Sequence, residues 1–155
     1  CMGLYAERIQ PGEGERWFIT GLLHDFDYEK HPTEEEHPFV GVEHLRGLGV
    51  DEEILSAILG HAEYSGTPRE TVMAKALFAV DELAGFIVAC TKVRPNGISD
   101  LKPKSVKKKL KDKRFAAAVS REDISQGIEE LGVDATGHIQ SCIDAIRAEG
   151  ERVGL

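Results

Sequence analysis

Cysteine and long apolar runs are both scarce in this sequence. The three cysteines, Cys1, Cys90 and Cys142, lie far apart from one another. They therefore fit neither a disulfide scaffold nor a thiolate zinc site, and are typical of small apolar residues in a reducing compartment. No apolar run approaches the roughly 20 residues that a membrane-spanning helix needs, and no signal-peptide pattern opens the chain. We therefore expect a cytoplasmic protein with no membrane partner.

Positive charge is also scarce, since 19 basic residues face 27 acidic ones and leave a formal net charge of -8. This balance argues against general affinity for nucleic acid. Lysines and arginines crowd the segment 102–114, but no aromatic residues interleave with its lysines, so we expect no specific nucleic-acid partner. Val106 and Leu110 would let this segment pack as a short helix with its lysines in water. The alternative is a rim that attracts phosphate.

Composition and periodicity indicate one all-α domain over residues 1–155. The sequence is 41% hydrophobic and 30% charged, as in soluble globular proteins, and its length suffices for one core. No segment predicts a convincing strand. Residues 1–8 read as the end of a helix without a capping residue, so we expect further residues upstream.

Helical spacing of apolar residues divides the rest of the chain into helices. They are expected at residues 13–25, 37–49, 51–61, 69–92, a short basic stretch after Pro103, 120–131 and 134–150, with N-caps at Asp51, Ser120 and Asp134. In the first of these we expect Trp17, Phe18, Ile19 and Leu22 to face inward, and in the second Val42, Leu45 and Leu48. The centre of the 69–92 helix is apolar nearly all round, which indicates burial on most sides.

Two groups of ionisable residues fall where this pattern predicts burial. His24-Asp25 end an apolar run, and Asp81 with Glu82 interrupts the most apolar helix. An unpaired buried charge is costly. Convergence of the imidazole and the carboxylates on a metal cation would resolve both cases, with Glu82 either orienting a ligand or lying at the surface.

The potential ligands are imidazole nitrogens and carboxylate oxygens alone. They are His24, Asp25, His37, His61 and Asp81. This mixture suits Mn, Fe, Co, Ni or Zn. A metal so held can lower the pKa of water and polarise a phosphoryl oxygen, and two metals about 3.5–4 Å apart could do both if one carboxylate bridges them. We expect structural roles for His31, His44 and His138.

These residues resemble the motifs of one known family. His24-Asp25 after Gly-Leu-Leu resembles the doublet of the HD-domain (HDIG-type) metal-dependent phosphohydrolase superfamily, and Asp81 in Ala-Val-Asp resembles its distal aspartate. Residues 37–41 resemble the His-Pro-x-x-Gly element of the binuclear subgroups, and residues 60–66 resemble their second histidine region. The resemblance implies a compact all-α bundle with the metal site at its centre.

In that family the metal-binding core would cover residues 17–91, followed by the basic segment and C-terminal helices at 102–155. The resemblance implies that His24, Asp25 and Asp81 hold one divalent metal, while His37 and His61 with a bridging Asp25 hold a second. Asp25 would thus be catalytic, through metal bridging and water activation. Candidates for substrate binding are Arg69, Lys104 and Lys108, although for Arg69 we favour an exposed position in a first helical turn.

The resemblance implies hydrolysis of a phosphomonoester or phosphodiester, a nucleotide being expected, by a metal-activated water. No histidine precedes His24, where the family has one on an upstream helix. Tyr28 stands where HD-GYP phosphodiesterases have lysine, and Ala62 follows His61 where they have a second histidine, which favours a small nucleotide or phosphate ester over a cyclic dinucleotide. The alternatives are a catalytically silent HD-fold domain that binds nucleotide or metal for regulation, and a protein-interaction module.

Overall fold

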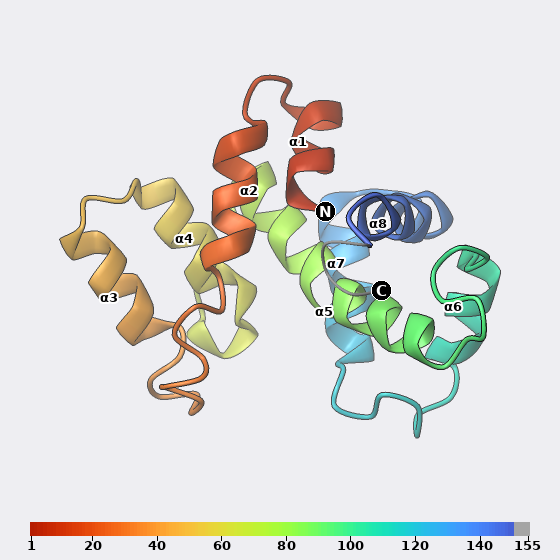
Figure 1. Ribbon diagram of the computed structural model, residues 1–155. Coiled ribbons are helices and arrows are strands. Elements are labelled where there is room, and N and C mark those ends of the chain that lie inside the picture. The colour runs from red at the N-terminus through yellow and green to blue at the C-terminus, as the bar shows by residue number, and fades with distance from the viewer. Residues whose placement is uncertain (151–155) are drawn as a thin grey trace. The chain divides into compact units, whose positions relative to one another are not determined.

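The computed structural model describes residues 1–150, and within them every regular element is helical (Figure 1). The elements are α1 (Met2–Ile9), α2 (Gly14–Leu23), α3 (Phe39–Gly47), α4 (Glu52–His61), the 3-10 helix η1 (Glu63–Ser65), α5 (Val72–Lys92), α6 (Pro103–Leu110), α7 (Arg121–Leu131) and α8 (Ala135–Ala148). The expectation of an all-α protein is confirmed. The end of the predicted domain, residues 151–155, lies outside the described residues. No helix of the described part has both the length and the apolar character needed to cross a membrane.

The predicted N-caps are present at three helices. The side chains of Asp51, Ser120 and Asp134 accept hydrogen bonds from backbone N–H groups in the first turns of α4, α7 and α8. The long helix α5 begins three residues later than the prediction, at Val72. Thr71 explains its start, because the Thr71 hydroxyl accepts the Ala74 N–H as a capping side chain does.

The chain forms two compact units, and the boundary between them falls inside α5. The first unit is Met2–Phe78, and the second begins at Ala79 and includes Cys1. In the first unit α1 packs on α2, α3 on α4, and α2 on α4. Its fully buried side chains include Trp17, Leu55, Ile58, Met73 and Leu77.

Helix α2 buries a narrower stripe than the sequence predicted. Trp17 and Thr20 are buried, with the Thr20 hydroxyl donating to the carbonyl of Arg16. The expectation that Phe18, Ile19 and Leu22 face inward is wrong, since Phe18 and Leu22 are 59% and 65% exposed and Ile19 is also exposed. Trp17 and Thr20 share one side of the helix at i, i+3 spacing, while Phe18 and Leu22 share another at i, i+4 spacing.

Helix α3 shows the same effect at its end. Val42 and Leu45 are buried as predicted, but Leu48 is 69% exposed. The helix ends at Gly47, so Leu48 lies beyond its last turn and the helical spacing no longer directs its side chain inward.

In the second unit, helices pack closely around the C-terminal part of α5. A Cβ atom added at Gly127 would lie 2.6 Å from the Ala79 Cα atom, so glycine permits the close approach of α7 to α5. His138 on α8 donates from Nε2 to the Ala79 carbonyl at 2.8 Å. Helix α6 packs on α8 with Val106 fully buried and Leu110 partly exposed, as the predicted apolar stripe requires.

Candidate metal centre

The side chains of the candidate site lie at three helix ends of the unit Met2–Phe78. His24 is the C-cap of α2 and Asp25 follows it directly. His37 precedes the N-cap Pro38 of α3, and His61 is the last residue of α4. At a helix end the chain leaves the regular backbone, so side chains of several helices can converge on one point.

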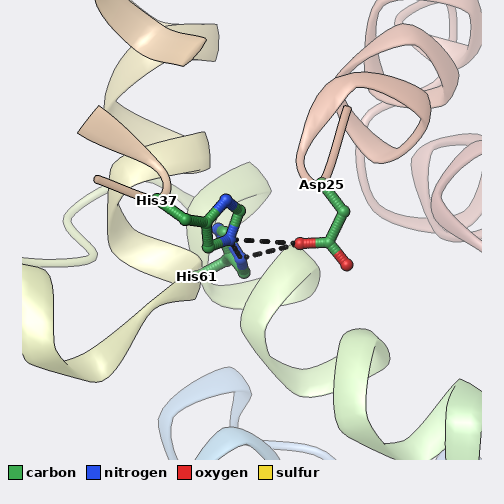
Figure 2. Close-up of side chains that lie close together, drawn as sticks. All are labelled: Asp25, His37 and His61. Atoms are coloured by element: carbon green, nitrogen blue, oxygen red, sulfur yellow. Dashed lines mark hydrogen bonds and ion pairs between the residues drawn. The ribbon is translucent and has the colours of Figure 1, made fainter. Parts of the chain in front are cut away.

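Asp25, His37 and His61 form a close cluster (Figure 2). Asp25 Oδ1 lies 3.3 Å from His37 Nε2 and 3.4 Å from His61 Nε2, and the two Nε2 atoms lie 3.3 Å apart. Both histidines are buried, whereas the Asp25 side chain is 51% exposed. The imidazoles therefore form the buried side of the cluster, and the carboxylate forms its solvent-exposed side.

The other ring nitrogen of each histidine has an oxygen acceptor. His24 Nδ1 donates to the Gly21 carbonyl at 2.8 Å, His61 Nδ1 to the Ile58 carbonyl, and His37 Nδ1 to a carboxylate described below. A neutral imidazole carries one N–H, so donation from Nδ1 leaves Nε2 as a lone pair. Metal-binding histidines show this arrangement, because the bond at the second nitrogen sets the tautomer and the ring orientation.

The donor set fits a divalent transition metal. Two imidazole nitrogens and one carboxylate oxygen form a nearly equilateral triangle with sides of 3.3–3.4 Å. Bonds of about 2.0–2.2 Å to a shared cation at near-tetrahedral angles place neighbouring ligand atoms about 3.3–3.6 Å apart. With all three atoms presenting lone pairs, a cation satisfies them better than any direct contact between them.

Asp25 also faces a third histidine with its other oxygen. Asp25 Oδ2 lies 3.2 Å from His24 Nε2, and the His24 and His61 rings meet edge to face. Burial alone would raise the pKa of Asp25, but His24 and His61, when protonated, carry positive charge and donate from Nε2 to the carboxylate, which outweighs burial and holds that pKa below its usual range. A carboxylate with its two oxygens directed at different histidines has the form that a bridging ligand needs.

One residue of the site was missed by the sequence reasoning. Asp27 is 5% exposed and accepts from His37 Nδ1 at 2.7 Å and from the Gly41 N–H at 2.8 Å. A Cβ atom at Gly41 would come within 2.6 Å of the Asp27 carboxylate. The glycine of the His-Pro-x-x-Gly element was the available signal, because a glycine can mark a place where another group packs closely against a helix. The sequence pattern does not identify that group as the Asp27 carboxylate.

The predicted substrate residue Arg69 makes internal contacts in the first unit. Its side chain is 7% exposed, and it donates to the Gly60 carbonyl at 2.9 Å and to Glu63 at 2.8 Å. Its guanidinium also lies over the Phe78 ring, 3.7 Å from the centroid. These contacts hold the end of α4, which carries His61, and a role in substrate binding stays a prediction.

The remaining predicted residues lie in the second unit. Asp81 is on α5, and its role as a ligand stays a prediction. Its neighbour Glu82 accepts the Ser120 N–H at the start of α7, and burial followed by the charge of Asp81 raises the Glu82 pKa. Lys104 and Lys108 are exposed on α6 and line a cleft of about 480 Å³. Their role toward substrate also stays a prediction.

Comparison with known families identifies the fold. The HD domain matches residues 2–85, which is more than half of the chain and includes all the predicted metal ligands. The chain therefore belongs to the HD domain family. No curated protein and no solved structure matches the chain.

Proposed function

We propose that this HD-domain chain is a metal-dependent phosphohydrolase that cleaves a phosphomonoester or phosphodiester, with a nucleotide as the expected substrate. Membership of the HD domain family supports hydrolysis of this class. The observation that carries the proposal is the triangle of lone-pair atoms formed by Asp25 Oδ1, His37 Nε2 and His61 Nε2. When each buried imidazole already donates its one proton from Nδ1, the two Nε2 atoms cannot hydrogen-bond to each other, whereas one cation can bind both.

In this proposal each residue of the cluster has a defined part. His37 and His61 supply buried neutral nitrogens, and Asp25 supplies an oxygen to them and a second oxygen toward His24. Asp81 is a proposed further ligand. A divalent cation bound here supplies Lewis acidity, which acidifies water and neutralises phosphoryl charge. Because the Asp25 side chain is half exposed while the histidines are buried, a phosphate ester would approach from the Asp25 side.

The ligand chemistry narrows the choice of metal. Nitrogen and oxygen donors without thiolates favour Fe, Mn, Ni, Co or Zn. The two carboxylate oxygens of Asp25 face different histidines, and this arrangement is compatible with one bound ion or with two. Elemental analysis of purified protein, with the ratio of metal to chain, would decide the number.

The test is turnover by the purified chain, stripped of metal and reloaded separately with Mn, Fe, Co, Ni or Zn. Substrates should include p-nitrophenyl phosphate, its bis ester and a panel of nucleotides. We expect metal-dependent release of phosphate or nitrophenol, with Asp51→Asn active and Asp25→Asn inactive. Asn still caps α4 at position 51, which makes this variant a matched control. Absence of both metal and turnover would overturn the proposal, and metal binding without turnover would favour a regulatory domain.

A further inference from the structure

The three histidines around Asp25, namely His24, His37 and His61, obtain their Nδ1 acceptors in two different ways. His24 and His61 each use the carbonyl three residues earlier, Gly21 and Ile58, because each follows a helical turn. His37 stands before the start of α3 and follows only an isolated turn, in which its N–H donates to the Thr33 carbonyl, rather than a regular helix. The acceptor for its Nδ1 is instead a side chain, Asp27, ten residues earlier in the sequence.

Asp27 is held as a buried carboxylate by the helix that it caps. The N-cap residue of α3, Pro38, provides no capping side chain. Asp27 Oδ2 takes over this role by accepting the Gly41 N–H at 2.8 Å, and the positive end of the helix dipole stabilises an anion there. The Asp27 carbonyl also accepts the N–H groups of Lys30 and His31 at 3.0 Å, so the backbone turns directly after Asp27.

These contacts leave Asp27 Oδ1 with one partner, His37 Nδ1 at 2.7 Å. A carboxylate can only accept, so it requires the proton of His37 to be on Nδ1. The lone pair of His37 is then on Nε2, which faces His61 Nε2 and Asp25 Oδ1. Carboxylates in this position fix the tautomer of metal-binding histidines and raise their basicity.

We infer that Asp27 is a positioning residue for the metal centre: it holds His37 in the Nδ1–H tautomer and aims Nε2 at the cation. This inference rests on the proposed function, since it concerns how one ligand of that centre is prepared. It adds a residue outside the predicted ligand set, and it assigns Gly41 the role of admitting the Asp27 carboxylate beside α3.

Asp27→Asn tests the inference with almost no change in shape. An asparagine whose carbonyl oxygen accepts the Gly41 N–H must direct its amide N–H₂ at His37 Nδ1. His37 then has to accept at Nδ1 and carry its proton on Nε2, where a metal would otherwise bind. The reverse orientation of the amide would bring two donors together in a buried place, which is unfavourable.

The first readout is the tautomer of His37 in metal-free protein, taken from the ¹⁵N chemical shifts of its ring. We expect Nδ1–H in the wild-type chain and a shift to Nε2–H in Asp27→Asn. His61 serves as an internal control, because its Nδ1 donates to a backbone carbonyl that the substitution leaves in place. An Nε2–H tautomer of His37 in the wild-type chain would overturn the inference, whether or not the variant folds.

The second readout is the affinity for Zn²⁺, measured by competition with a chromophoric chelator. Loss of such a partner lowers metal affinity about 10–100-fold, and we expect this for Asp27→Asn. Glu36→Gln is the matched control, because Glu36 pairs with His31 Nδ1 at 3.3 Å in the same loop and is not part of the cluster. Equal Zn²⁺ affinity of wild type and Asp27→Asn would overturn this role of Asp27 and leave the proposed function standing. Absence of Zn²⁺ uptake by the wild-type chain would overturn the metal centre itself, and this role with it.

Discussion

His37 Nε2 and His61 Nε2 lie 3.3 Å apart although the residues are 24 positions apart in the sequence. Each ring donates from Nδ1, so neither facing nitrogen has a proton to share when the rings are neutral. Two lone pairs in this relationship repel each other, and Asp25 Oδ1 adds a third. The unit Met2–Phe78 thus concentrates negative potential at a point where a cation would be stabilised.

The first prediction concerns Asp25, the residue that contacts His24, His37 and His61. Asp25→Asn removes the negative charge and makes one of the two contacting atoms a donor. We expect Zn²⁺ affinity to fall by more than the roughly 10–100-fold typical of an outer partner, because Asp25 is a proposed direct ligand. Chelator competition measures the loss. Asp51→Asn should bind Zn²⁺ as the wild type does, and an unchanged affinity in Asp25→Asn would contradict the assignment.

The second prediction concerns the space beside α3. In Gly41→Ala the new methyl group would meet the Asp27 carboxylate at 2.6 Å and the Phe26 ring at 2.9 Å. Such overpacking lowers the free energy of unfolding by about 1–3 kcal/mol. Urea denaturation of metal-free protein measures it. The control is Gly47→Ala in the same helix, where a Cβ atom meets nothing within 4 Å. Equal stability of the two variants would show that α3 can move away from Asp27.

A third prediction addresses the second unit, where Gly127 contacts Ala79. A methyl group at Gly127 would lie 2.6 Å from the Ala79 Cα atom and 3.1 Å from its nitrogen, and the backbone of α5 cannot rotate away as a side chain can. We expect Gly127→Ala to be destabilised by at least about 1–3 kcal/mol. Gly85→Ala, at an exposed position of α5 with open space around it, should instead gain up to about 1 kcal/mol. Thermal unfolding of both variants tests the contrast, and a stable Gly127→Ala would refute it.

The fourth prediction is a pH dependence due to His138. Burial lowers the pKa of His138 below 6.5, against the opposing effect of its bond to the Ala79 carbonyl. Below the unfolded value of 6.5, the unfolded chain binds a proton at this position that the folded chain does not. The contribution of His138 to stability is therefore present above that pH and is lost as the pH falls toward the folded pKa.

His138→Gln removes the titrating group and retains a donor for the Ala79 carbonyl. Urea denaturation in the presence of a chelator, at about pH 7.5 and 5.5, should show a smaller loss of stability on acidification in the variant than in the wild type. The other histidines are the same in both proteins, so the difference between the two losses isolates His138. Identical losses would contradict the prediction.

Part of the site could be recognised before the fold was known. His24-Asp25, His37 and His61 were assigned because charged groups follow apolar runs and because their motifs resemble those of the HD-domain family. Asp27 could not be found in this way, since its two partners lie 10 and 14 residues further along, across a loop without periodicity. A loop carries no repeating pattern that predicts which side chain points inward.

What the sequence determined by itself was local. Apolar spacing and capping residues set the helices and most of their ends, because each turn and each cap depends on residues within four positions of one another. Which apolar side chains are covered was decided by tertiary packing alone, as Phe18 and Leu22 show by their exposure on a correctly predicted helix. The 3.3 Å approach of His37 to His61, and the carboxylate that fixes the proton of His37, were also decided there. Both depend on where the ends of separate helices meet, and the spacing of residues along the sequence does not specify how far apart those ends lie.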